Sequence, residues 1–233
     1  MRSWTVAFLI PIVCHGQDVG RPGSKAGQSM VDVAMNVPRI VVELRYATDR
    51  NLVKSAIYPP NARCFVRQSV AERLNRVQDW LDKNAPKGTR LKIWDGWRPS
   101  WAQDRLWKEF PDREYVANPR EGSLHTWGAA VDVTLVDANG NDLRMPTDFD
   151  VLTLAARSKY TGTDGEIRRN LGLLQRAMSS AGFQLLHDEW WHFVARDWQT
   201  FAPTRVSLTG GIEQRAPNLS GNVMPKKRAV SAR

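Results

Sequence analysis

The chain has 233 residues, of which 42% are hydrophobic and 24% are charged, a balance typical of one globular domain of roughly 200 residues with a real core. Its formal net charge is +9, but +5 of this lies from Thr204 onward and one further positive charge belongs to Arg2, which leaves +3 for the body. So small a charge does not argue for a nucleic-acid footprint, and no nucleic-acid partner is expected.

The first residues have the layout of a secretory signal peptide. Arg2 precedes an apolar run from Trp4 to Cys14, and small residues follow near Gly16. The run is too short to span a bilayer as a mature helix. We therefore expect residues 1–16 to be removed and the protein to be exported to the periplasm, with no stable membrane span in the mature chain. Acylation of Cys14 is less favoured, because Val13 is bulkier than the residue usual before a lipidated cysteine.

Residues 17–203 are expected to form one folded domain. Cleavage after Gly16 would leave Cys64 as the only cysteine, so no intrachain disulfide is expected and stability must come from packing. Residues 204–233 contain several glycines and prolines and few large apolar side chains. This composition predicts a flexible, basic tail.

In the first half of the domain, two strands and two helices are predicted. Residues 39–48 are rich in β-branched side chains at a period of two and predict a strand. Apolar residues at helical spacing predict a helix over residues 69–81, with Ser69 as its N-cap. Residues 90–94 predict a second strand, and Ser100 is a suitable cap for a short helix that ends near Glu109.

In the second half, residues 129–137 alternate again and predict a strand, followed by a turn at Asn139-Gly140. Thr163 and Glu166 form a capping-box pattern before an apolar stripe that Gly182 closes. A final strand is expected to contain residues 183–194. The elements do not alternate as βαβ units, and the turn favours antiparallel pairing. The predicted class is α+β, a small antiparallel sheet flanked by helices.

Histidines near carboxylates suggest a metal site. Beyond the signal peptide only His125, His187 and His192 remain; His125 precedes Asp132, and Glu189 precedes His192. Imidazole nitrogens and a carboxylate suit zinc, and three such ligands leave a fourth position open for catalysis. On regular strands these pairs would point to opposite faces, so the chain must bend near Gly128 and through Trp190 and Trp191.

Each of these residues also has a structural interpretation. A histidine beside a tryptophan is more often packed or exposed than a metal ligand. Asp132 could be a strand-end carboxylate satisfied by backbone donors, and Glu189 could simply be solvated. Arg98 could be a surface residue stacked on an aromatic ring. Taken singly, none of them establishes a function.

Taken together, the motifs resemble the zinc D-Ala-D-Ala peptidases, which are related by fold to the Hedgehog signalling domain. The vancomycin-resistance type of D-alanyl-D-alanine dipeptidase is the closer match. The resemblance runs from about Ile40 to Trp198. It rests on L-R-Y-A-T at residues 44–48, D-G-W-R-P at 95–99, S-x-H-x-x-G-x-A-x-D at 123–132, a Phe-Asp pair at 149–150 and E-W-W-H at 189–192.

The resemblance implies a Hedgehog/DD-peptidase-like fold, one zinc ion per chain and hydrolysis of the free dipeptide D-Ala-D-Ala in cell-wall peptide turnover. The implied zinc ligands are His125, Asp132 and His192. Glu189 matches the general base and Arg98 the arginine that stabilises the oxyanion.

The resemblance also assigns pocket residues that hold the dipeptide. These are Ser123, Tyr46 and Asp150, with Asp150 placed to meet the substrate ammonium group. His187 matches no ligand and is expected in a surrounding or surface position. Trp97 stands where a tyrosine is common in the family, which leaves the breadth of substrates open.

Two other functions remain as alternatives. A D,D-carboxypeptidase that trims peptidoglycan stem peptides would share the same ligands and base, but it would leave the amino end of its substrate open. A non-catalytic binding module would keep the fold and the zinc without turnover, and the presence of both Glu189 and Arg98 argues against it. The motifs leave the oligomeric state open.

Overall fold

The computed structural model describes residues 29–113 and 115–210, so the predicted signal peptide, Cys14 and the last part of the predicted tail lie outside the described residues. The elements in chain order are β1 (Met30–Asp32), α1 (Val33–Asn36), β2 (Val41–Val42), η1 (Arg45–Ala47), β3 (Phe65–Arg67), α2 (Gln68–Asn84), β4 (Arg90–Asp95), α3 (Ser100–Glu109), β5 (Ala130–Val136), η2 (Leu154–Ala156), α4 (Gly165–Ser180), β6 (Phe183–Leu185), β7 (His192–Ala195) and η3 (Trp198–Thr200).

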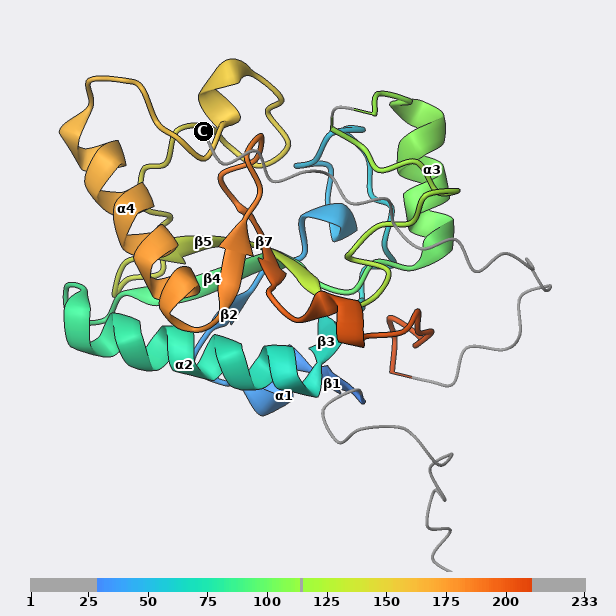
Figure 1. Ribbon diagram of the computed structural model, residues 1–233, viewed down its shortest axis with the longest axis horizontal. Coiled ribbons are helices and arrows are strands. Elements are labelled where there is room, and N and C mark those ends of the chain that lie inside the picture. The colour runs from blue at the N-terminus through green and yellow to red at the C-terminus, as the bar shows by residue number, and fades with distance from the viewer. Residues whose placement is uncertain (1–28, 114, 211–233) are drawn as a thin grey trace, which may run out of the picture.

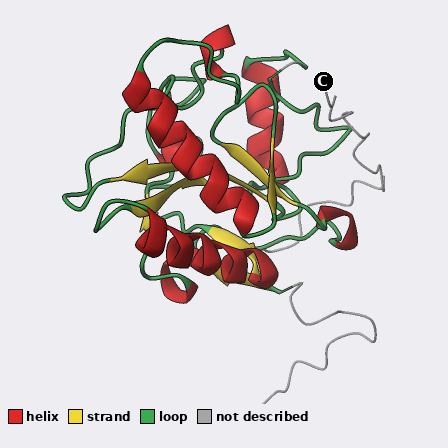
Figure 2. Ribbon diagram, turned by 60° about the vertical axis from the view of Figure 1, so that its left-hand side comes forward, coloured by secondary structure: helices red, strands yellow, loops and turns green. Residues whose placement is uncertain are grey.

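Among the described residues, a five-stranded sheet in the order β2-β4-β5-β7-β6 forms the centre of the fold, and β1 and β3 form a separate pair. Helices α2 and α4 contact each other and the sheet, and Figure 1 shows α3 apart from them, at the other end of the molecule. In Figure 2, α2 and α4 both lie against the strands. The α+β class with helices flanking a small sheet is confirmed. One pair departs from the antiparallel prediction, because β2 and β4 run parallel and are joined by a long connection through α2.

Helix α2 confirms the predicted apolar stripe, since its side chains Val70, Leu74, Val77 and Leu81 are all fully buried. The helix is longer than predicted, from Gln68 to Asn84. The predicted cap was wrong: the N-cap position is Arg67, the last residue of β3, and it makes no side-chain capping bond. The helix therefore continues directly from the strand, and Ser69 already lies inside it.

The other two predicted caps were also displaced by one residue. Helix α4 is capped by Asp164, whose carboxylate accepts hydrogen bonds from the backbone N–H groups of Glu166 and Ile167, so Thr163 is not the cap. Asp164 is the N-cap residue, directly before Gly165, the first residue of the helix. In α3, Ser100 is the first helical residue and the N-cap position belongs to Pro99.

The strand predicted over residues 39–48 is mostly a turn. Only Val41–Val42 pairs with β4, and the chain then forms the 3-10 turn η1. The reason is non-local: the Tyr46 carbonyl accepts the N–H groups of Ile57 and Tyr58, so this backbone is bound by a following loop rather than by a strand. Tyr46 consequently lies on a turn.

Strand β5 is buried on both faces, although its sequence alternates. Val131 and Val133 point to one face of the sheet and Asp132 to the other, and all three are buried. The predicted turn after β5 is present, with Gly140 at a φ of 88° and an Asp137 N–H that donates to the Asn141 carbonyl. The polar face of β5 is therefore covered by loops, and Asp132 lies beneath them.

The predicted final strand is a hairpin of two strands. β6 ends at Leu185 and β7 begins at His192, and the two pair antiparallel. The break between them is a turn in which the His192 N–H donates to the Glu189 carbonyl at 3.2 Å. Buried Trp190 and Trp191 fix this turn, and the backbone N–H of Trp190 donates to the Ala156 carbonyl. The bend required between Glu189 and His192 is therefore supplied by a turn.

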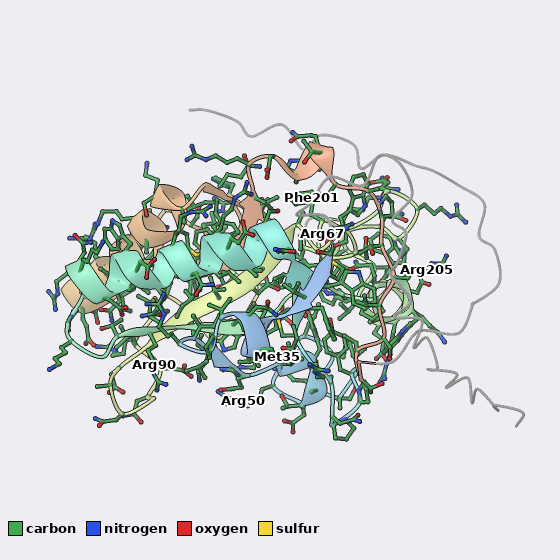
Figure 3. All side chains as sticks on the ribbon, turned by 90° about the horizontal axis from the view of Figure 1, so that it is seen from below. Met35, Arg50, Arg67, Arg90, Phe201 and Arg205 are labelled. Carbon is green, nitrogen blue, oxygen red and sulfur yellow. The ribbon has the colours of Figure 1, made fainter. Side chains whose placement is uncertain are left out.

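The first residues of the predicted tail lie against the domain. Leu208 is buried, and its carbonyl accepts the Arg63 N–H at 2.7 Å. Phe201 and Ala202, just before the tail, are held by Arg67. Its guanidinium lies 5.6 Å from the centre of the Phe201 ring and donates to the Ala202 carbonyl (Figure 3). Within the described residues, no helix is both long enough and apolar enough to cross a membrane.

Candidate metal centre

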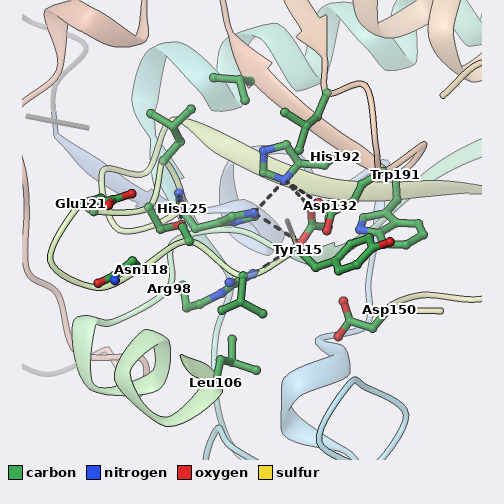
Figure 4. Close-up of a pocket in the computed structure, with 18 of the residues that line it drawn as sticks. Arg98, Leu106, Tyr115, Asn118, Glu121, His125, Asp132, Asp150, Trp191 and His192 are labelled. Carbon is green, nitrogen blue, oxygen red and sulfur yellow. Dashed lines mark hydrogen bonds and ion pairs between the residues drawn. The ribbon is translucent and has the colours of Figure 1, made fainter. Parts of the chain in front are cut away.

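Three of the predicted side chains meet in one place. Asp132 on β5 and His192 at the start of β7 are direct partners in the antiparallel ladder, so their side chains lie on the same face. His125 comes from the turn before β5, where Gly128 has a φ of 68° and lets the chain curl back over the strand. One ligand atom from each residue lies within 4.8 Å of the others, and all three residues are buried (Figure 4).

The spacing of these atoms fits a zinc ion. His125 Nε2 is 3.1 Å from His192 Nδ1, Asp132 Oδ1 is 3.0 Å from His192 Nδ1, and Asp132 Oδ2 is 3.4 Å from His125 Nε2. Ligand atoms bound tetrahedrally at about 2.0–2.1 Å from zinc lie roughly 3.3 Å apart. Two imidazole nitrogens and a carboxylate are also ligands that zinc prefers. The donor set and its geometry therefore fit zinc.

The protonation states of the ligands suit metal binding. Although burial opposes the charge of Asp132, its interactions with His125 and His192 hold the pKa of this carboxyl well below its usual range. Burial lowers the pKa of His192, even though Asp132 acts in the opposite direction. A charged carboxylate and a neutral imidazole are the forms that ligate a metal.

Backbone contacts orient His125. Its Nδ1 lies 2.7 Å from the Gly96 carbonyl, which places the ring proton on that nitrogen and leaves Nε2 to face the other two ligands. The His125 N–H donates to Ser123 Oγ at 3.3 Å. Ser123, one of the predicted substrate residues, thus lines the pocket and also holds the turn that carries His125.

Replacing Gly96 with alanine is expected to destabilise the protein and to weaken zinc binding. A Cβ at this position would lie 2.8 Å from the Phe65 carbonyl oxygen and 2.8 Å from Cys64 Sγ, so the strand end must shift. The cost is about 1–3 kcal/mol of unfolding free energy, as for overpacking elsewhere. Displacing the carbonyl from His125 is expected to weaken zinc binding by roughly tenfold to a hundredfold.

Thermal unfolding and competition with a chelator measure these two effects. Gly165→Ala is the matched control, because a Cβ there meets only the flexible end of Arg169, at 3.4 Å. If Gly96→Ala bound zinc as tightly as the control, the Gly96 carbonyl would not be what orients His125.

Glu189 and Arg98 come from different parts of the chain and lie near the three ligands. Glu189 lies in the turn before β7, and its Oε2 is 3.9 Å from His192 Nδ1. Arg98 follows β4, and its Nη2 is 3.6 Å from Asp132 Oδ2. Both side chains line the same pocket as the ligands. A carboxylate and a permanent cation therefore both lie close to the candidate metal position.

Arg98 is fixed by buried partners to which the sequence analysis gave no role. Its Nε donates to Asp95 Oδ2 at 2.9 Å, and its Nη1 donates to Gln103 Oε1 at 2.9 Å. The Tyr58 hydroxyl donates to the other oxygen of Asp95 at 2.8 Å. Asp95 belongs to the D-G-W-R-P string, so its spacing from Arg98 could have predicted this contact. No sequence pattern could have predicted the contacts of Gln103 and Tyr58.

Asp150 and Tyr46 form another part of the pocket wall. Asp150 has a φ of 58°, an uncommon backbone conformation for a residue with a side chain, and its Oδ2 accepts the Leu52 N–H at 2.9 Å. Burial raises the pKa of Asp150 to about 7, with a further contribution from Asp132, while the Leu52 N–H and Arg98 act against this rise. The Tyr46 ring lies beneath the Arg98 guanidinium at 4.8 Å.

The cavity around these residues has a volume of about 480 Å³, within the range of small-molecule sites. Figure 4 shows Asp150 on one side of the metal ligands and Asn118 and Glu121 on the other. The segment from Tyr115 to Leu124 supplies much of the lining, together with Leu52 and Gln199. Apart from Ser123, no sequence pattern points to these residues. His187 is exposed and pairs with Asp188, away from the ligands, as its place in the sequence predicted.

Comparison with known proteins identifies similar sequences over most of the chain. The profile of the D-Ala-D-Ala dipeptidase family, peptidase family M15, matches residues 26–207. The D-alanyl-D-alanine dipeptidase of Escherichia coli K12 is 35% identical over 164 residues, which cover 70% of this chain and 83% of the relative. The D-alanyl-D-alanine dipeptidase of Enterococcus faecalis is 31% identical over 175 residues, covering 65% and 83%, and that of Enterococcus faecium is 30% identical over 179 residues, covering 66% and 85%.

Proposed function

Because the chain belongs to the D-Ala-D-Ala dipeptidase family of metallopeptidases, we propose that it hydrolyses the free dipeptide D-Ala-D-Ala to two D-alanines, with one zinc ion per chain. One observation carries the proposal. His125, Asp132 and His192 bring their ligand atoms together in a single pocket, and Glu189 and Arg98 line that same pocket.

The metal would be held by His125 Nε2, His192 Nδ1 and the Asp132 carboxylate. When bound, zinc supplies Lewis-acid activation of water and of the peptide carbonyl. The three side chains contribute one negative charge, so half of the +2 charge of a zinc ion would remain available to the substrate. The buried surroundings of the ligands strengthen that electrostatic effect.

Glu189 is assigned to proton transfer. Its carboxylate lies beside His192 rather than among the three converging ligand atoms, and this position supports a role beside the attacking water. In this position it accepts the proton of that water and then gives a proton to the departing amine. The turn through Trp190 and Trp191 keeps this carboxylate on the pocket side of β7.

Arg98 is assigned to the oxyanion that develops on the scissile carbonyl. It remains charged, and Asp95 and Gln103 hold its guanidinium in one direction before the substrate binds. A donor fixed in advance lowers the barrier more than a mobile one, because nothing has to reorganise during the reaction. Removing comparable donors costs about a hundredfold or more in rate.

The two ends of the substrate are assigned from the pocket wall. Asp150 is assigned as the acceptor for the ammonium group. It supplies a carboxylate on one wall of the pocket, and the loop with Asn118 and Glu121 forms the opposite wall. Tyr46 and Ser123 line the same cavity and complete the surface around the dipeptide. A charged amino end held by Asp150 would distinguish a free dipeptide from the end of a longer peptide.

The alternatives differ in what they require of the pocket. A binding module has no need of Glu189 and Arg98 beside the ligands, so their placement favours an enzyme. The carboxypeptidase alternative draws support from the cavity, because about 480 Å³ would accommodate a ligand larger than two alanines. Asp150 on the wall favours the dipeptidase.

Zinc-loaded protein is expected to release D-alanine from free D-Ala-D-Ala and to leave a stem pentapeptide that ends in D-Ala-D-Ala largely intact. The rates on the two substrates, measured by D-alanine release at equal concentrations, test this expectation directly. Faster release from the pentapeptide would favour the carboxypeptidase. Zinc-loaded protein that cleaved neither substrate would favour the binding module.

We also propose that the reaction takes place after export, as part of cell-wall peptide turnover. Support comes from the signal-peptide pattern of residues 1–16 and from the chemistry of D-Ala-D-Ala, a constituent of peptidoglycan stems. Export can be tested by measuring enzyme activity in the periplasmic fraction of cells that produce the full chain.

A further inference from the structure

We propose that Asn51 is a positioning residue that sets selectivity for the substrate ammonium group: it folds the loop of residues 45–55 so that the Leu52 N–H holds the Asp150 carboxylate toward the pocket. The inference rests on the proposed function, in which Asp150 binds the ammonium group. Asn51 does not line the pocket, so its effect must pass through its neighbours.

Asn51 is almost completely buried, and its side-chain amide is bonded on both sides. Its Nδ2 donates to the carbonyls of Arg45, Thr48 and Ser55 at 3.2, 2.6 and 2.9 Å. Its Oδ1 accepts the Val53 N–H at 3.0 Å. One side chain thus binds four backbone groups of a loop that has no regular secondary structure after η1.

The loop needs this amide because its carbonyls turn inward. Without Nδ2 the Arg45 carbonyl would still accept the Thr48 N–H and hydroxyl groups, but the partly buried carbonyls of Thr48 and Ser55 would lose this donor. A carbonyl removed from water and left without a donor is costly, so the loop would have to rearrange. The residue that would move with the loop is Leu52, which directly follows Asn51 and precedes Val53.

Leu52 is the link to the pocket. Its N–H donates to Asp150 Oδ2 at 2.9 Å across 98 residues of sequence. Asp150 itself has the left-handed φ of 58°, a conformation that persists only where its surroundings hold it. A shifted Leu52 would release the carboxylate, which could then turn away from the substrate amino group.

Arg45, the first residue of the loop, contacts the segment that leads to Asp150. The Arg45 guanidinium is fully buried, lies 4.8 Å from the Trp94 ring and pairs with Asp148 at 3.6 Å, two residues before Asp150. The same loop therefore contacts the Asp150 segment twice, through a backbone N–H and through a charge. Asn51 bonds the Arg45 carbonyl and so joins these two contacts.

The experiment compares two dipeptides that differ at the amino end. D-lactyl-D-alanine has a hydroxyl where D-Ala-D-Ala has an ammonium group, so the ratio of their kcat/KM values measures recognition of the charge. This ratio does not depend on the fraction of folded enzyme, because the same molecules cleave both substrates. Asn51→Ala is expected to lower the ratio at least tenfold, and Asn51→Ser, which keeps one short donor, is expected to fall between Asn51→Ala and the natural enzyme.

Gln78→Ala is the matched control. Gln78 is also a buried amide that bonds backbone, donating to the Thr89 carbonyl and accepting the Leu91 N–H, but it lies on α2 and does not line the pocket. Its loss is expected to lower the melting temperature and to leave the substrate ratio unchanged. A comparable fall of the ratio in both variants would mean that the effect is not specific to the contacts of Asn51, and it would overturn the inference.

A double-mutant cycle tests the route through Asp150. Asp150→Asn alone should lower the ratio, and adding Asn51→Ala should lower it little further, because the two act on one interaction. An unchanged ratio in Asn51→Ala, an unchanged ratio in Asp150→Asn, or independent effects in the double variant would each overturn the inference. Failure of the proposed function is a separate result, namely no cleavage of D-Ala-D-Ala by the natural zinc-loaded enzyme.

Discussion

Glu189→Ala is expected to retain one zinc ion per chain and to lose nearly all hydrolysis of D-Ala-D-Ala. The carboxylate lies 3.9 Å from His192 Nδ1 and is not one of the three groups whose atoms converge, so its loss should leave the metal in place. Loss of a general base lowers kcat by about a hundredfold to ten-thousandfold. Zinc content by elemental analysis and kcat for D-alanine release are the two measurements.

His125→Ala provides the contrast. This variant is expected to lose both zinc and activity, since it removes one of the three converging donors and leaves Asp132 and His192 as a two-ligand site. Glu189→Gln keeps the size of the side chain and should behave like Glu189→Ala. If the Glu189 variants lost zinc in step with activity, Glu189 would be a ligand; if they kept substantial turnover, it would not be the base.

N-acetylation of D-Ala-D-Ala is expected to lower kcat/KM by a hundredfold or more. The acetyl group removes the ammonium charge and adds bulk beside Asp150, whose carboxylate would lose its partner in a largely buried setting. An unpaired buried charge costs several kcal/mol, enough for this discrimination. Rates on the free and acetylated dipeptides, measured with the same zinc-loaded preparation, test the assignment.

Asp150→Asn supplies the internal control for that comparison. It should reduce the advantage of the free dipeptide and retain zinc, because Asp150 is not among the converging ligands. Equal rates on both substrates, or a preference for the acetylated one, would support the carboxypeptidase alternative, for which acylated peptides are natural substrates. A variant with an unchanged preference would show that Asp150 does not bind the ammonium group.

Local patterns correctly predicted the elements that depend on neighbouring residues. The stripe of Val70, Leu74, Val77 and Leu81 predicted the buried face of α2, because helical spacing brings these side chains together whatever the rest of the chain does. Asn139-Gly140 predicted a turn for the same reason, since the turn depends on the conformational freedom of Gly140.

Patterns failed where distant backbone groups competed for the same segment. Residues 39–48 alternate as a strand does, yet the Tyr46 carbonyl is bound by the N–H groups of Ile57 and Tyr58. Residues 183–194 appeared continuous by composition, but the turn at Glu189 divides them. Caps were misplaced by one residue or more because Ser69, Ser100 and Thr163 are suitable cap residues whose position in the helix depends on where the preceding segment ends.

The chemistry of the candidate site could be predicted from the residues. Two imidazoles and a carboxylate suggest a metal site, because side-chain chemistry belongs to the residue and not to its surroundings, and the resemblance of the strings to a known peptidase family implies hydrolysis. The distances depend on the folded chain: His125 and His192 are 67 residues apart in sequence, and the pairing of β5 with β7 brings their nitrogens to 3.1 Å. The folded chain also determines the supporting contacts of Asn51 and Leu52, because every residue except proline has a backbone N–H, and only packing selects the one that faces Asp150.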